Sequence, residues 1–282
     1  MRLIAFLLFL FVFFTSFSQE KTLLYKISKE GHQESYVYGT MHILPDSLFY
    51  FPNKLKKTVK KSEELILEID EKSVSQKEIL KLMALESGSA FDIFTKEQKD
   101  SVLNWGSKLT GLTPALFEST FSKQEPFALM QLSVLETMKQ PHKMVEKELE
   151  VIARENNIPT SGLESIAFQL SIFKDLPDSL LSDMILQTIR TSGDYTETLK
   201  LYTAYKNQDV ELLYELINED EQLADKEAVL LSNRNEDWIP KIDAKTKEKK
   251  CFFAVGAGHL GGEKGVLNLL RKQGYTVEAI TY

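Results

Sequence analysis

Two segments near opposite ends of the chain share one pattern, an apolar run that leads directly into Gly-x-x-His. The first runs from Tyr36 to His42 and the second from Phe252 to His259. Each apolar run has the length and composition of a buried strand, and the glycine permits a sharp turn at its end. Because ligands bind outside the carboxyl ends of strands in open α/β sheets, the pattern predicts that both histidines lie at one functional edge.

The other periodic patterns concentrate strands towards the two ends of the chain. Strands are predicted at 23–28, 36–39, 64–70, 160–164, 251–255 and 275–280, and helices at 52–61, 145–156, 177–190, 195–206, 210–217, 221–237 and 263–272. The sequence therefore predicts an α/β fold with an α+β tendency. We expect a central, mostly parallel sheet formed by the N- and C-terminal strands, with a helical insertion over about 73–240.

The first 18 residues have the three parts of a secretory signal peptide: a charged start at Arg2, an apolar run and a small-residue end. Cleavage is predicted between Ser18 and Gln19 or close by. The apolar run is shorter than the roughly 20 residues that a membrane span needs, and an uncleaved anchor is the alternative. Removing 18 of the 282 residues leaves 264, which is enough for a single domain over 19–282. We expect no membrane span in that part of the chain, because no later apolar stretch is long enough to cross a bilayer. The sequence thus predicts a secreted or periplasmic protein.

The charge distribution argues against one class of partner. The formal net charge is −7, and Lys and Glu are mixed along the chain rather than collected into a basic face. We therefore expect no nucleic-acid partner. The single cysteine, Cys251, lies in a strand-like run and has no second cysteine to pair with, so we expect it to be a buried apolar side chain.

Two carboxylates complete a candidate site with the two histidines. Glu68 interrupts a strand that otherwise has a buried pattern, where a carboxylate needs a partner, a cation or a proton. Glu164 stands at the end of the 160–164 strand. Such a set suits zinc, manganese or cobalt, with His42, Glu68 and His259 as metal ligands. The same residues could equally act without metal, as a general base oriented by a carboxylate.

Each of these residues also has a structural interpretation. A single Gly-x-x-His is a weak motif, and its repetition in two matching strand contexts is what points to function. Glu68 could be an ion-paired member of an edge strand. Arg234 lies on a predicted helix, where it is either part of a polar face or a group that holds a substrate carboxylate or a developing oxyanion.

At these residues the chain resembles the TraB/GumN family, which includes the Tiki proteins, and the likeness covers most of residues 19–282. The matching pieces are residues 38–42, 65–70, 162–164 with Gln169, Arg234 with Asn235 and Trp238, and 254–260. In this family the two Gly-x-x-His motifs and the early glutamate are the proposed metal or catalytic residues, which implies His42, His259 and Glu68 here. Many members have Gly-x-Asp before the central helix, where this chain has Met144, Val145 and Glu146.

The resemblance also implies classes of function. Tiki proteins are regarded as metal-dependent proteases, related folds include erythromycin-esterase-like hydrolases and haem-binding lipoproteins, and other members are described as regulators of peptide pheromone signalling. We therefore expect an exported, metal-assisted peptidase with Glu68, Glu164 and Arg234 as catalytic residues and a peptide or protein substrate. The alternatives are a non-catalytic protein that binds a peptide or haem-like ligand in the same cleft, and an envelope interaction protein with a decayed site.

Overall fold

The computed structural model describes residues 21–69, 74–133, 141–218 and 227–282, so the predicted signal peptide lies outside the described residues. The strands are β1 (Leu24–Ser28), β2 (Ser35–Thr40), β3 (Leu44–Pro45), β4 (Glu64–Ile69), β5 (His142–Lys143), β6 (Thr160–Glu164), β7 (Cys251–Gly256) and β8 (Thr276–Ala279). The helices are α1 (Asn53–Lys60), α2 (Gln76–Leu82), α3 (Lys96–Thr110), α4 (Pro114–Phe121), α5 (Phe127–Gln131), α7 (Val145–Glu155), α8 (Ile166–Lys174), α9 (Asp178–Arg190), α10 (Thr196–Lys206), α11 (Val210–Asn218), α13 (Asn233–Glu248) and α14 (Val266–Lys272). A π-helical turn, η2 (Ala228–Ser232), precedes α13, and a 3-10 turn, η3 (Ala257–His259), follows β7.

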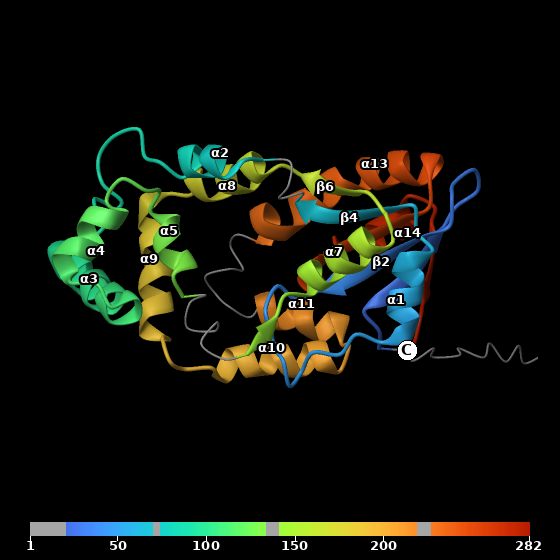
Figure 1. Cartoon of the computed structure of the whole chain (residues 1–282), viewed down its shortest axis with the longest axis horizontal. Helices are drawn as coiled ribbons and strands as arrows, with labels where there is room; N and C mark the ends of the chain where they lie inside the picture. Colours follow the sequence, from blue (N-terminus) through green and yellow to red (C-terminus); the bar gives the residue numbers. More distant parts are fainter. Residues whose placement is uncertain (1–20, 70–73, 134–140, 219–226) are drawn as a thin grey trace, which may run out of the picture.

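Six strands form one sheet in the order β6-β4-β7-β2-β1-β8, and β3 pairs separately with β5. The pairs β2–β7, β4–β7 and β4–β6 are parallel, while β1 is antiparallel to both β2 and β8. The predicted α/β fold with a mostly parallel central sheet is confirmed, although one edge strand, β6, comes from the middle of the chain rather than from either end. The C-terminal strand β7 inserts between β2 and β4, so segments from the two ends of the chain alternate across the centre of the sheet (Figure 1).

The parallel pairing brings four strand ends to one edge. Thr40 at the end of β2 is opposite Gly256 at the end of β7, and Ile69 at the end of β4 is opposite Glu164 at the end of β6. Residues that end these strands or follow them directly therefore share the carboxyl edge of the sheet, where open α/β folds bind ligands.

Strand β7 lies within the hydrophobic core of the protein. Its residues Cys251 to Val255 are all buried, as expected for a parallel strand covered on both faces, and the predicted apolar role of Cys251 is confirmed. Helices add fully buried side chains to the same core, including Leu55 from α1, Leu149 from α7 and Trp238 from α13.

A second hydrophobic cluster lies among the helices, away from the sheet. Helices α3, α4, α5 and α9 gather at one end of the molecule in Figure 1, and the cluster includes Phe91, Phe117, Phe127 and Ile185. A Cβ atom at Gly106 of α3 would lie 2.1 Å from the ring of Phe117. The glycine is what allows α3 to approach α4 so closely.

The helix predicted over 221–237 differs from the structure at its end. Among the described residues, the π-helical turn η2 leads into α13, which continues through Pro240 to Glu248. Proline lacks the N–H that would bond the preceding turn and normally ends a helix. The helix persists here because Ile239 and Ile242, on either side of the proline, are buried in the core.

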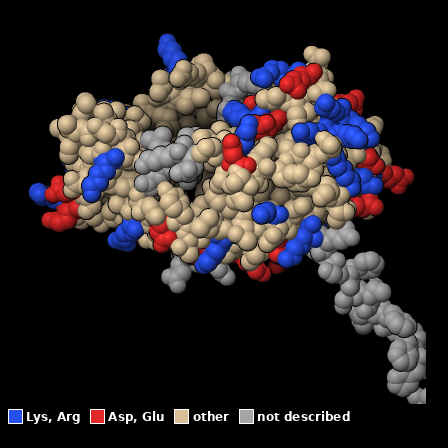
Figure 2. Space-filling view, turned by 60° about the horizontal axis from the view of Figure 1, so that its bottom comes forward, with Lys and Arg blue, Asp and Glu red and all other residues tan. Residues whose placement is uncertain are grey.

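The surface view shows Lys and Arg interspersed with Asp and Glu over the visible face (Figure 2). Of the helices within residues 21–69, 74–133, 141–218 and 227–282, none is long and apolar enough to cross a membrane.

Candidate functional site

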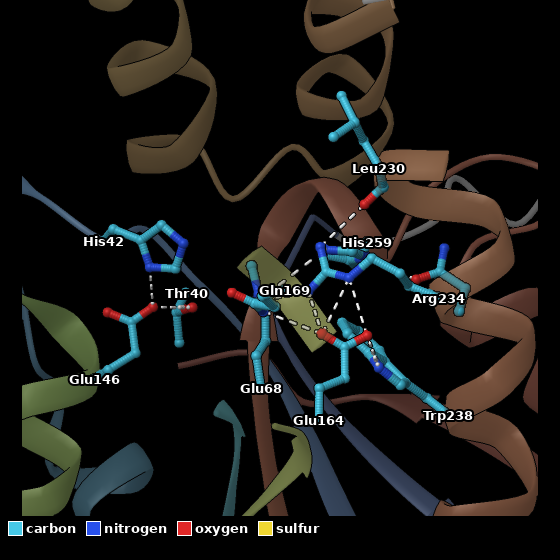
Figure 3. A network of polar contacts seen from close by, with 12 residues as sticks. Thr40, His42, Glu68, Glu146, Glu164, Gln169, Leu230, Arg234, Trp238 and His259 are labelled. Atoms are coloured by element: carbon cyan, nitrogen blue, oxygen red, sulfur yellow. Dashed lines mark hydrogen bonds and ion pairs between the residues drawn. The ribbon is translucent and has the colours of Figure 1, made fainter. Parts of the chain in front are cut away.

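Four adjacent strands deliver the predicted site residues to the carboxyl edge of the sheet. His42 follows β2, Glu68 lies near the end of β4, Glu164 ends β6, and His259 follows β7 in η3. Arg234 comes from the first turn of α13. The side chains form two groups, one around His42 and the other around Arg234 (Figure 3).

Arg234 is the centre of the larger group and uses all of its hydrogen-bond donors inside the protein. Nε donates to Glu164 Oε1 at 3.0 Å, and Nη2 donates to Glu164 Oε2 at 2.8 Å and to Glu68 Oε2 at 2.7 Å. Nη1 donates to the Leu230 carbonyl at 3.0 Å and to His259 Nε2 at 3.2 Å. A guanidinium has five N–H groups, so none remains free for a substrate in this arrangement.

Glu164 is the buried anchor of that arginine. Its side chain is 1% exposed, and besides Arg234 it accepts hydrogen bonds from Trp238 Nε1 at 2.8 Å and Gln169 Nε2 at 3.1 Å. The sequence predicted catalytic roles for Glu164 and Arg234. The structure places both in a saturated buried network that leaves neither of them an atom free to contact substrate, so their geometry suits positioning rather than direct chemistry.

Glu68 differs from Glu164 because it reaches the cavity. Oε1 accepts the backbone N–H of Gly256 at 2.7 Å, and Oε2 is bonded by Arg234 and by Gln169, the latter at 3.3 Å. Burial alone raises the pKa of Glu68, but the charge of a protonated His259 and that of Arg234 outweigh it, so the pKa falls to about 2. Glu68 is therefore a carboxylate at neutral pH.

His259 is buried and held in one orientation. The amide of Asn235 donates from Nδ2 to the Lys264 carbonyl, which turns Oδ1 towards Nδ1 of His259 at 2.7 Å. The ring of His259 also packs 4.5 Å from that of Trp238, centre to centre. Burial, which outweighs the attraction of Glu68, lowers the pKa of His259 to about 4. The neutral ring thus donates from Nδ1 and accepts the Arg234 N–H at Nε2.

His42 has the opposite environment. Its side chain is 70% exposed, and Nδ1 lies 2.7 Å from Oε1 of Glu146, which also accepts the Thr40 hydroxyl. The hydrogen bond to Glu146 raises the pKa of His42 to about 9. Nε2 of His42 has no hydrogen-bond partner among the described residues and is free to exchange a proton with a ligand.

Both histidines line one cavity of about 480 Å³, together with Glu68 and Arg234. A smaller cavity of about 90 Å³ continues on the α7 side and shares His42, Glu68 and Gln169 with the first. The structure therefore brings His42 and His259 to one cavity, as their matching strand contexts predict, and the hollow extends past His42 and Glu68 on both sides.

The predicted metal ligands fit a divalent ion in type but not in arrangement. Among residues that the structure describes, no three His, Cys, Asp or Glu side chains come close enough to hold one ion. Nε2 of His259 and Oε2 of Glu68 both bond Arg234, whose positive charge would repel a cation placed between them. His42 is paired with Glu146 in the other group. The arrangement favours the metal-free alternative, a histidine oriented by a carboxylate.

Sequence reasoning did not find the partners of the two histidines. Glu146 was noted only where the chain departs from Gly-x-Asp, although its place at the start of α7 puts it beside the turn after β2. Asn235 follows Arg234 directly, and this adjacency on α13 was the available signal. Neither separation, 104 residues for Glu146 and 24 for Asn235, forms a local motif.

All the site residues lie within the part of the chain that matches a known protein family. The family model of the TraB/PrgY/gumN family matches residues 23–279, which include every strand of the sheet. The chain belongs to the TraB/PrgY/gumN family. The resemblance seen in the sequence is confirmed, and this member of the family carries both Gly-x-x-His turns at one sheet edge.

Similar proteins include the uncharacterized protein YbaP of Shigella flexneri and that of Escherichia coli K12. Each is 25% identical over 250 residues, which cover 87% of this chain and 90% of the relative. No solved structure matches the chain.

Proposed function

We propose that this TraB/PrgY/gumN protein is an exported hydrolase that cleaves peptide bonds in the cavity beside its two Gly-x-x-His turns. The observation that carries the proposal is that Glu68 and His42 line the same cavity while bonded to partners of opposite charge, Arg234 for Glu68 and Glu146 for His42. The pKa of Glu68 is lowered to about 2 and that of His42 is raised to about 9. Environments that push two pKa values apart give one site both a base and an acid near neutral pH.

Glu68 is the general base in this proposal. Oε1 accepts the Gly256 N–H and retains a lone pair for a water in the cavity. As the water attacks the scissile carbonyl, its proton passes to this carboxylate. Arg234 and Gln169 fix the other oxygen and so orient the group.

His42 is the general acid. Glu146 holds the imidazolium through Nδ1, so Nε2–H is available to protonate the leaving amine. Each such proton transfer contributes typically about 10²–10⁴-fold to a rate. Arg234 acts as a positioning residue because it keeps Glu68 ionised and oriented. Glu164 acts through Arg234, which it holds in place, and neither residue contacts the substrate.

The shape of the site supports an extended substrate. The two cavities meet at His42 and Glu68, with the larger bounded by α8, α10 and α11 and the smaller by α7. A peptide lying across both would pass its backbone between the acid and the base. Export rests on the signal-peptide pattern of the first 18 residues.

Substitution of Glu68 tests the base. Glu68→Gln keeps the shape but removes the charge, and we expect the cleavage rate of a mixed peptide library, followed by mass spectrometry, to fall about 10²–10⁴-fold. Glu64→Gln is the matched control, because Glu64 is a buried glutamate on the same strand whose partners, Ser161, Lys245 and Lys249, do not line the cavity. Equal activity of the Glu68 variant and wild type would refute the proposed base.

Chelation tests the metal prediction separately. With acid and base supplied by the chain, we expect cleavage to survive exhaustive chelation. Loss of activity on chelation, with recovery in manganese, cobalt or zinc, would contradict the metal-free chemistry and support the ligand set His42, Glu68 and His259. Peptide or haem binding without any turnover would instead support the non-catalytic alternative.

A further inference from the structure

The larger cavity has a wall of a different chemical character from its polar end. Seven apolar side chains contributed by α8, α10, α11 and η2 line it: Ile172, Phe173, Leu201, Leu213, Ile217, Leu230 and Leu231. The charged groups among the described lining residues are paired at the polar end of the cavity, Arg234 with Glu68 and Glu164, and His42 with Glu146. The apolar wall therefore offers no free counter-charge from the described residues.

Ile217 joins the apolar wall to the catalytic edge. A Cβ atom at Gly258, within the second Gly-x-x-His, would lie 2.4 Å from Cδ1 of Ile217. The glycine therefore lets the isoleucine pack directly on the turn that carries His259. Ile217 is only partly buried, so one side of it packs on the turn and the other faces the cavity.

Helix α11 presents apolar side chains in two directions. Leu213 and Ile217, four residues apart, face the catalytic cavity, whereas Leu212 and Leu216 line a separate groove against α10. Figure 1 shows α11 beside α10. The helix thus contains both residues that would contact a substrate and matched residues of the same type that would not.

We propose that the substrate presents a large, uncharged apolar side chain next to the scissile bond, and that Ile217 limits the size of that side chain. This inference rests on the proposed hydrolase. A charged side chain placed against this wall would lose its hydration without gaining a partner. An apolar side chain would be buried against the wall at no such cost, while the backbone of the substrate reached Glu68 and His42.

Ile217 should determine which sizes of apolar side chain the pocket accepts. One methylene in an apolar pocket changes selectivity by about tenfold or more. Ile217→Ala would enlarge the pocket at the junction, so a phenylalanine peptide should gain over a leucine peptide. Leu216→Ala removes the same kind of side chain from the part of α11 that lines the separate groove, and should leave that ratio unchanged.

The test uses acetylated and amidated tripeptides Ala-X-Ala in which X is leucine, phenylalanine or aspartate. We expect wild type to cleave the leucine peptide at least tenfold faster than the aspartate peptide, as kcat/KM. Ile217→Ala should raise the ratio of phenylalanine to leucine cleavage about tenfold, and Leu216→Ala should not. Equal cleavage of leucine and aspartate peptides, or an unchanged ratio in a folded Ile217→Ala variant, would overturn the inference.

A binding measurement separates this inference from the proposed reaction. In Glu68→Gln protein, methyl resonances of Ile217 and Ile172 should shift with the leucine tripeptide and not with the aspartate tripeptide, while those of Leu212 and Leu216 stay fixed. If these shifts occur but wild type cleaves nothing, the apolar pocket stands and the hydrolase proposal fails. If wild type cleaves peptides but the shifts are absent, the pocket fails and the hydrolase stands.

Discussion

Two histidines with the same local sequence reach opposite protonation states because their surroundings differ. His259 is buried beside Arg234, and its pKa falls to about 4, whereas the carboxylate of Glu146 raises the pKa of the exposed His42 to about 9. The Gly-x-x-His pattern predicted that both would lie at the sheet edge. It could not predict their roles, because the partners that set each pKa come from α7 and α13.

Replacing Glu146 tests the assignment of His42 as the acid. A general acid works only below its pKa, so activity should persist up to about pH 9 and decline above it. Glu146→Gln removes the charge that favours the imidazolium. We expect the alkaline limb of the kcat/KM profile to move down towards the ordinary histidine pKa of about 6.5.

The pKa of His42 itself, followed by NMR of its ring proton, should move in the same direction. Glu148→Gln on the same helix is the control, since Glu148 pairs with Lys143 and not with His42. An alkaline limb that stays fixed while the His42 pKa drops would separate the histidine from the chemistry.

At the level of elements, the six strands of the main sheet were predicted, whereas the short strands β3 and β5 and the full length of α13 were not. Apolar runs that lead into glycine marked β2 and β7, because a buried strand needs apolar side chains and the glycine permits the sharp turn that follows it. The end predicted at 237 was wrong, because α13 continues through Pro240 to Glu248, with the residues on either side of the proline buried in the core. At Pro240, packing in the core therefore outweighs the helix-breaking tendency of proline.

Helix α10 is connected to the turn before His42 by one buried hydrogen bond. Tyr205 donates its hydroxyl to the Gly39 carbonyl at 3.1 Å and lies 3.3 Å from the hydroxyl of Tyr38. Tyr205→Phe would leave that carbonyl unsatisfied, and we expect the free energy of unfolding to fall by about 1–3 kcal/mol. Urea denaturation measures the change.

Tyr202→Phe on the same helix is the comparison, because Tyr202 is only partly buried and makes no such bond to the turn. Its stability should stay within about 0.5 kcal/mol of wild type. Equal stability of the two variants would show that the α10 hydrogen bond does not hold the turn.

On the scale of the whole molecule, the site exists only because both ends of the chain enter one sheet. The strands predicted near the two ends of the chain indicated that both ends would enter one sheet. The position of β7 between β2 and β4 could not be predicted, because every parallel order of these strands buries similar apolar side chains. That order is what puts His259 between the elements that carry His42 and Glu68. The helical cluster around Phe117 lies apart from these strands.

The central claim is that Glu68 and His42, on strands separated by β7, act as base and acid of one reaction. A double-mutant cycle of Glu68→Gln and His42→Gln, measured as kcat/KM on one cleaved peptide, tests it most directly. Each single variant should lose about 10²–10⁴-fold. Groups that act as a unit are strongly non-additive, so the double variant should lose little more than the worse single variant. A double variant whose loss equals the product of the two single losses would contradict the claim.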